Sequence, residues 1–434
     1  MDSIDYHKTN EKIFWRGTLF LFVLGLLLHI LLVLLSWIGG DQIHLLNLGI
    51  RFALHNQIDP FGKYMTGAGA NPGILLQLLI GFPLKIIPHY LAPMIVVVLF
   101  HTLAGWIFLR MVKDIWGNRA MFVGAILFWT STWRLYTSCL LWEPSYIIPF
   151  AVVHVWAVWN LRTRAVFVPS LILALILFLA IQIHNSSFVI ILLTAILVWK
   201  KMIQLDWKGF VIGALVGSLT LLPTVWAVLQ GTLPEARHSQ GFIGQSMLMV
   251  YPVLKGALYC VTFGGMDVVR PLSETVFIRN AGWTYIAILA YVIQFLGLIT
   301  ICFSIAALWW FLKPLRKETS SMDNIEVWLR KYVGYACLSL IISATLSPIV
   351  LQGWQVVIML PSLVLPTIAW FNHKLSMGIR QKKLYTTILY SYVIVQVAAI
   401  FLIAAHLYIV KPTNTLPNGV AHGSELARII ISSD

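Results

Sequence analysis

The chain has 434 residues, of which 59% are hydrophobic and 11% are charged, and its mean hydropathy is +0.85. Soluble domains carry about 25% charged residues, so this composition excludes a soluble protein and indicates a polytopic membrane protein. The net charge of +14 comes from lysines and arginines in short clusters between apolar runs, which is how membrane topology signals are distributed. We therefore expect membrane lipids, and not nucleic acid, around these clusters.

The first membrane span is predicted over residues 13–38. Lys8, Lys12 and Arg16 precede or begin it, so the positive-inside rule places the N-terminus in the cytoplasm. The apolar run is too long for the core of a signal peptide, which predicts a retained helix. Residues 39–90 then form a loop on the external side.

An amphipathic helix is predicted at the start of this loop. Its polar residues are Asp41, His44, Asn47, Arg51 and His55, which recur at steps of three or four, the spacing of one helix face. The residues between them are mostly apolar, so the helix is suited to lying at a membrane surface. The alternative is an interfacial helix with a wet face and no chemistry.

A second interfacial helix is predicted at Gly73–Ile87, a short apolar run that contains Gly81 and Pro83. If this run lies flat, the next span is 91–110 and the basic loop at 110–119 is cytoplasmic. If it crosses, that loop becomes external and the later basic clusters contradict the positive-inside rule. We therefore expect it to lie at the interface.

The remaining chain is predicted to continue as one integral membrane domain, residues 1–434. The predicted parts are spans 2 to 6 over residues 91–229, an external loop at 230–280, C-terminal spans over 281–410 and an external tail at 411–434. The fold class is an all-α polytopic membrane protein with about 11 transmembrane helices. The Gly213-x-x-x-Gly217 spacing favours close helix packing in it.

Two carboxylates are the candidate catalytic residues. Asp41 and Glu143 each lie at the outer end of a long apolar run, where a pair of acids could orient and deprotonate an acceptor hydroxyl. Glu143 could instead be a first-turn acid that the helix dipole favours. Asp59, in Asp59-Pro60-Phe61-Gly62, is interpreted as a turn residue.

Basic residues on the same face are candidates for binding a lipid phosphate or pyrophosphate. Lys63 and Lys85 lie near the small-residue loop at 67–73, and Arg134 precedes Glu143. Ordinary contact with lipid headgroups is the alternative for each of them. His44 and His184 complete the predicted substrate-binding residues.

Histidines and cysteines form no dense cluster in the sequence, and HExxH and GxSxG are absent. No metal ligand is predicted, although a divalent cation stays open as a cofactor. His101 and His154 fall inside predicted spans, where a histidine usually bonds a neighbouring helix.

Several stretches resemble the GT-C membrane glycosyltransferases. Asp41-Gln42 after the first span, Asp59-Pro60-Phe61-Gly62 and Asn71-Pro72-Gly73 are similar to their first external loop. The nearest branch is the protein O-mannosyltransferase and aminoarabinose transferase superfamily, the dolichyl-phosphate-mannose-protein mannosyltransferase-like proteins. Further similar stretches follow in the same order, at Arg110–Arg119, Trp142–Ser145, Gln182–Ser186 and Met359–Pro366.

The chain departs from this pattern at two places. Gln42 stands where the family often has a second acid, and Gly353-Trp354-Gln355 stands where Arg or His-Tyr is usual.

The resemblance implies an inverting hexosyl or pentosyl transferase in a bacterial inner membrane. Such an enzyme moves a sugar from a polyprenyl-phosphate donor to a lipid, glycan or protein acceptor on the external face. By the same resemblance Asp41 would be the general base or would orient the acceptor hydroxyl, and Glu143 would be the second carboxylate. The resemblance also implies that Lys63, Lys85 and Arg134 are candidates for binding the lipid phosphate.

Three other functions remain open. A lipid or small-molecule transporter or flippase is disfavoured because the long apolar runs carry no acid or base near their middle and no paired broken helices. A non-catalytic GT-C-like subunit of a cell-envelope glycan assembly is kept open by Gln42. An O-antigen polymerase or ligase would have its key residues late in the chain.

Overall fold

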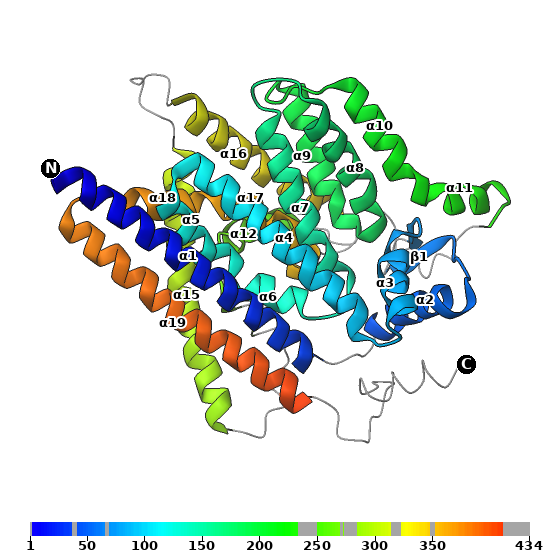
Figure 1. Cartoon of the computed structure of the whole chain (residues 1–434), viewed down its shortest axis with the longest axis horizontal. Helices are drawn as coiled ribbons and strands as arrows, with labels where there is room; N and C mark the ends of the chain where they lie inside the picture. The colour runs from blue at the N-terminus through cyan, green and yellow to red at the C-terminus, as the bar shows by residue number, and fades with distance from the viewer. Residues whose placement is uncertain are drawn as a thin grey trace.

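The computed structural model describes residues 2–36, 41–65, 69–232, 250–269, 272, 284–313, 323–347 and 352–410. It is a bundle of helices with one two-stranded sheet (Figure 1). The predicted all-α membrane fold is confirmed. About half of the predicted external loop at 230–280 and all of the predicted tail at 411–434 lie outside the described residues.

Five of the described helices are long and apolar enough to cross a membrane. They cover Glu11–Leu35, Leu91–Trp116, Trp207–Leu229, Ile288–Leu312 and Ile379–Tyr408. Helices suit this environment because they satisfy their own backbone polar groups. The total of about 11 spans, which counts shorter helices too, stays a prediction, as does the sidedness.

Helix α1 (Asp2–Leu35) packs beside α4 (Leu91–Trp116), α5 (Asn118–Gly124) and α19 (Ile379–Val410), and α19 runs alongside it in Figure 1. Trp129 joins α1 to the bundle, since its indole N–H donates to the carbonyl of Phe22 at 2.9 Å.

The predicted span at 120–138 is not one continuous helix. It consists of α5, a π-helical turn at Ala125–Trp129, and α6 (Thr132–Ser138). The amide of Thr130 bonds the carbonyl of Ala125 at 3.0 Å, five residues back, which is the wider hydrogen bond of a π-turn. Gln396 of α19 donates to the carbonyl of Thr130, so a distant helix holds the break.

Helices α7 (Glu143–Asn160), α8 (Phe167–Ile183) and α9 (Phe188–Trp199) follow. The next helix, α10 (Trp207–Ser218), packs on α8 through glycines, and α11 (Leu222–Leu229) continues from it. A Cβ on Gly213 would collide with the carbonyl of Leu171, and one on Gly217 would lie 2.8 Å from Phe178. The predicted close packing at these two glycines is confirmed.

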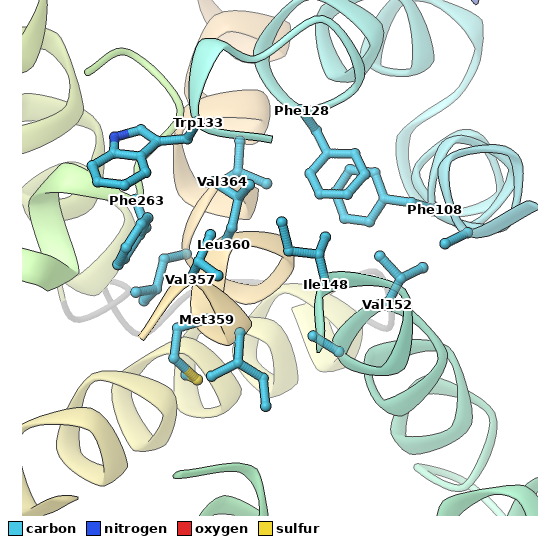
Figure 2. Packing of buried hydrophobic residues seen from close by; sticks show 14 of the residues in the cluster. Phe108, Phe128, Trp133, Ile148, Val152, Phe263, Val357, Met359, Leu360 and Val364 are labelled. Carbon is cyan, nitrogen blue, oxygen red and sulfur yellow. The ribbon is translucent and has the colours of Figure 1, made fainter. Parts of the chain in front are cut away.

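The C-terminal helices are α12 (Val250–Thr262), α15 (Thr284–Leu312), α16 (Asp323–Leu346), α17 (Leu360–Leu363), α18 (Leu365–Lys374) and α19. Figure 2 shows their contribution to the buried centre. Val357, Leu360 and Val364 lie between Trp133 and Phe263 on one side and Ile148 on the other. This apolar core fixes α6 and the start of α7, on which the candidate site depends.

Candidate functional site

The predicted external loop folds into a small unit at one end of the bundle. Its elements are α2 (Asp41–His55), β1 (Phe61–Met65), β2 (Gly69–Pro72) and α3 (Leu75–Ile86), and they lie together beside the end of α8 in Figure 1. The predicted amphipathic helix is present, because Leu45, Leu46 and Leu48 of α2 are buried while Asp41 is exposed. Helix α3 spans about 18 Å at 1.5 Å per residue, too short for a hydrocarbon core of about 30 Å. Its interfacial position stays a prediction.

Hydrogen bonds to the bundle hold the hairpin in place. The Asn71 amide donates to the carbonyl of Ile183 at 2.9 Å, and the backbone N–H of Gly73 donates to Thr224 Oγ1 at 2.7 Å. Gln77 of α3 donates to the carbonyls of Leu48 and Gln57. These bonds hold β2 and the chain before β1, and with them the hairpin that carries Lys63.

Gly73 is essential to this anchor. Its φ is +85°, and a Cβ there would collide with the side-chain oxygen of Gln182. We expect Gly73→Ala to destabilise the protein by about 2–3 kcal/mol, from the positive φ and the clash together. Thermal unfolding in detergent measures this. Gly231→Ala is the matched control, because Gly231 has a φ of +81° and open space around it. An equal loss of stability in both variants would contradict a role for the contact with Gln182.

Asp59 does more than shape a turn. One of its oxygens lies 2.9 Å from the guanidinium of Arg51 on α2, and its backbone N–H donates to Gln77 at 3.1 Å. The interpretation of Asp59 as a turn residue stays a prediction, and the structure adds that its carboxylate ties the loop to α2. Arg51 is likewise an ion-pair partner and not only part of a wet helix face.

The centre of the site is an ammonium group shared by two carboxylates. The Lys63 Nζ lies 2.8 Å from Asp41 Oδ2 and 3.0 Å from Glu143 Oε1. The Lys63 side chain is 13% exposed, Glu143 is 8% exposed and Asp41 is 69% exposed. The fold thus brings together three predicted site residues from α2, β1 and the first turn of α7.

Burial and charge act in opposite directions on Glu143, which precedes the predicted span at 146–159. Burial raises the pKa of this carboxyl above its ordinary value. The ammonium of Lys63 opposes that rise in pKa, while the nearby carboxylate of Asp41 adds to it. Glu143 therefore depends on Lys63 for its charge, whereas Asp41 keeps its contact with solvent.

His184 lies at the same end of the bundle, just beyond α8. Burial, together with the charge of Lys63, lowers the pKa of His184 to about 4. Its Nδ1 accepts the backbone N–H of Ser186 at 3.1 Å, so the ring is neutral with its hydrogen on Nε2 at neutral pH. The prediction that His184 joins this end of the molecule agrees with its position. Its contact with substrate stays a prediction.

Lys85 contacts a different part of the loop from the acid pair. The Lys85 ammonium donates to the side chain of Asn56 at 2.5 Å and lies 4.8 Å from the ring centroid of Phe52. His44 is half-buried on α2. The structure does not bring Lys85 to the group formed by Lys63, Asp41 and Glu143.

Arg134 is not an external cation, and this prediction is wrong. Its side chain is fully buried on α6. Its Nε donates to the carbonyl of Trp129 at 2.6 Å, and its guanidinium lies 3.9 Å from the Trp129 ring centroid. The break in the predicted span turns α6 into the core, where the guanidinium of Arg134 lies over the Trp129 ring.

Two histidines hold the turn that presents Glu143. The His101 Nε2 donates to the carbonyl of Ser145 at 2.7 Å, and the His29 Nε2 donates to the carbonyl of Ser138 at 3.1 Å. Ser145 O has no helical partner because residue 149, which would donate to it, is Pro149. The sequence signal for this contact was a proline four residues after Ser145. The expectation that His101 bonds between helices is confirmed.

We expect His101→Leu to destabilise the protein by about 1–3 kcal/mol, because it leaves the buried carbonyl of Ser145 without a donor. Adding Pro149→Ala supplies a backbone N–H at the helical position for that carbonyl. The double variant should therefore recover part of the lost melting temperature in detergent. Pro149→Ala alone serves as the control. If the double variant is no more stable than His101→Leu, the carbonyl is not the reason for the loss.

His154 behaves as predicted for a histidine inside the bundle. Its Nε2 and the Thr194 hydroxyl of α9 are 2.8 Å apart. In the part of the chain that the structure describes, no group of three or more His, Cys, Asp or Glu side chains is placed to hold a metal ion. A requirement for a divalent cation stays a prediction.

Comparisons with known proteins support the fold. No protein-family profile matches the sequence, and no curated protein matches it. The apo crystal structure of the Archaeoglobus fulgidus oligosaccharyltransferase is similar, with a TM-score of 0.50 and 12% sequence identity. The likeness covers 90% of this chain and 56% of that one, so this chain matches little more than half of the archaeal protein. At this identity the likeness shows a GT-C-type fold.

Proposed function

We propose that this chain is a membrane glycosyltransferase that moves a sugar from a polyprenyl-phosphate-linked donor to an acceptor on the external face of the membrane. The observation that carries the proposal is the contact of one ammonium, that of Lys63, with both Asp41 and Glu143. Such a group offers a base and a phosphate-binding cation within one site. The GT-C-type fold and the likeness to an oligosaccharyltransferase add support.

The transfer step assigns one role to each group. The acceptor hydroxyl loses its proton to Asp41 while its oxygen forms a bond to the anomeric carbon of the sugar. The bond between that carbon and the phosphate oxygen breaks, and the bonding electrons leave with the phosphate. Attack from the side opposite the phosphate inverts the anomeric carbon.

Asp41 suits the role of base because it is exposed. Its side chain is 69% exposed, and the bond that the structure gives it joins Oδ2 to Lys63. A donor phosphate that binds Lys63 weakens this ion pair and frees the carboxylate to accept a proton. Lys63 then offsets the charge on the leaving phosphate, which is the electrostatic part of catalysis.

Glu143 suits the role of support. It is buried and paired with Lys63, so it holds the ammonium at the position where the phosphate would leave. The protein surroundings also exclude water from this side of the pair, which strengthens the interaction of fixed charges. The proposed acceptor is a lipid, a glycan or a protein, and experiment must distinguish them.

Gln42 does not weaken this proposal. The side chain of Gln42 is buried, whereas that of Asp41 is exposed. Gln42 therefore faces the protein interior and Asp41 faces solvent. Glu143 supplies the second carboxylate in place of an acid at position 42. The predicted non-catalytic subunit remains an outcome of the test.

The test compares membrane glycolipids by mass spectrometry in the wild type, a deletion strain and a strain with Asp41→Asn. We expect the donor lipid to accumulate and the glycosylated product to disappear in both altered strains. An unchanged glycolipid and glycan profile in the deletion strain would contradict the proposed transferase activity. A changed profile in the deletion strain with a normal one for Asp41→Asn would favour a non-catalytic subunit.

A further inference from the structure

A narrow groove lies between α15 and α19, away from the candidate site. It has a volume of about 180 Å³. Nine residues line it, namely Leu296, Ile299, Thr300, Phe303, Thr387, Ile388, Ser391, Tyr392 and Val395. Both helices are long and apolar enough to cross a membrane, and Ile299 in the lining is 47% exposed, so the groove opens toward lipid.

Three of the four hydroxyl groups around the groove bond the protein backbone. Thr300 donates to the carbonyl of Met266 at 2.6 Å, and Tyr392 donates to that of Gly265 at 2.6 Å. Thr387 donates to the carbonyl of Lys383 at 3.0 Å within its own helix. With these groups satisfied by the protein backbone, the groove presents hydrocarbon and suits a hydrocarbon chain.

A basic cluster lies just beyond one end of the groove. Arg380, Lys382 and Lys383 are exposed in the first turn of α19, and none of them forms an ion pair among the described residues. Lys383 precedes Thr387 by one helical turn, about 6 Å along the axis. Helix α19 has 32 residues, about 48 Å, so its ends extend beyond a hydrocarbon core of about 30 Å.

Aromatic rings connect the basic end to the groove. The Lys374 ammonium lies 5.6 Å from the Tyr385 ring centroid, and that ring lies 5.1 Å from Trp370. Trp370 in turn lies 6.1 Å from Phe303, which lines the groove. Tyrosine and tryptophan beside basic residues are typical of the boundary between headgroups and acyl chains. Because Lys383 and Thr387 are one turn apart on α19, the cluster adjoins the groove along that helix.

We propose that this surface binds one anionic phospholipid of the bilayer, with an acyl chain in the groove between α15 and α19 and its phosphate at Arg380, Lys382 and Lys383. The apolar groove alone would accept any acyl chain. The unpaired positive charge at its mouth selects a lipid with a net negative headgroup. This site is independent of the acid pair at Asp41 and Glu143.

The test measures lipid binding to the full-length protein in detergent by native mass spectrometry. The probes are phosphatidylglycerol and phosphatidylcholine with identical acyl chains. We expect the wild type to retain phosphatidylglycerol preferentially. Lys382→Gln with Lys383→Gln should weaken its binding about 25-fold, since each lysine near a membrane surface contributes about five-fold. Binding of phosphatidylcholine should change little.

Two controls are matched to these changes. Lys200→Gln with Lys208→Gln removes the same charge from exposed residues elsewhere and should leave binding unchanged. Ser391→Phe fills the groove and should weaken the binding of both lipids, whereas Ile394→Phe, on a neighbouring lipid-facing residue that is 70% exposed, should not. Equal retention of the two lipids by the wild type would overturn the proposal, as would an equal loss in the two double-lysine variants. The lysine variants decide the result if Ser391→Phe does not fold.

Discussion

Asp41→Asn is expected to lower sugar transfer by about 10²- to 10⁴-fold, the range for loss of a general base. Asparagine has nearly the same shape as aspartate, but it cannot accept the acceptor's proton. Because Asp41 is 69% exposed and Lys63 keeps its second partner in Glu143, the protein should fold normally. The measurement is transfer of labelled sugar from a polyprenyl-phosphate donor in membranes that contain equal amounts of each protein.

Asp59→Asn provides the matched control for this result. It makes the same chemical change in the same loop between α1 and α4, at a carboxylate that pairs with Arg51 and lies outside the acid pair. We expect it to retain most of the transfer activity. Normal transfer by Asp41→Asn would remove Asp41 from the mechanism, and an equal loss in both variants would indicate damage to the loop and not to the chemistry.

Lys63→Met should abolish transfer and also destabilise the protein by about 2–3 kcal/mol. Breaking a fully buried ion pair costs about 3–5 kcal/mol, and the value here is smaller because Lys63 keeps some contact with solvent. Without the ammonium, the pKa of Glu143 rises further above its ordinary value, since burial and Asp41 both favour the protonated form. A group whose pKa is raised by folding stabilises the folded state below its unfolded pKa of about 4.3 and loses that contribution as pH rises. The melting temperature of Lys63→Met should therefore fall further below that of the wild type as pH rises from about 4.3 toward neutrality.

A second substitution separates folding from chemistry. In Lys63→Met with Glu143→Gln the buried carboxylate is gone, so most of the lost stability should return at neutral pH while transfer stays absent. Lys85→Met is the control for stability, because Lys85 is bonded to Asn56 at an exposed position and its loss should change the melting temperature little. Recovery of transfer in the double variant would contradict a direct role for Lys63.

In the proposed mechanism the ammonium of Lys63 exchanges one of its two carboxylate partners for the donor phosphate. In the structure Lys63 is held by both Asp41 and Glu143, so the base is paired before a donor arrives. In the proposed mechanism a phosphate competes for the same ammonium, and Asp41 is the partner that leaves because it faces solvent. The unequal burial of the two acids supports that proposal, in which Asp41 moves and Glu143 stays fixed.

Local patterns in the sequence were enough for much of the architecture. The steps of three and four from Asp41 to His55 define a helix face, and the structure has that helix as α2 (Asp41–His55). The Gly213 and Gly217 spacing predicted close helix packing, because a missing Cβ lets two helices approach closely, and the structure has that packing between α8 and α10. Both features depend on residues within a few turns of each other.

The position of Arg134 could not be predicted from local sequence patterns. In the sequence it stands before Glu143 at the end of an apolar run, and an external position follows if that run is one helix. The π-turn at Ala125–Trp129, held by Gln396 from more than 260 residues away, turns Arg134 inward instead. A contact of that separation leaves no periodic signal in the sequence.

The sequence by itself determined that this protein is helical, spans a membrane and carries acids at the ends of two apolar runs, because hydropathy and helix period are properties of neighbouring residues. Only the tertiary structure decided which charges meet. It brought Lys63 from β1 between Asp41 and Glu143, left Lys85 with Asn56 and buried Arg134 against Trp129. The physical reason is that an ion pair depends on a few ångströms between side chains, and those distances are set by the packing of whole helices.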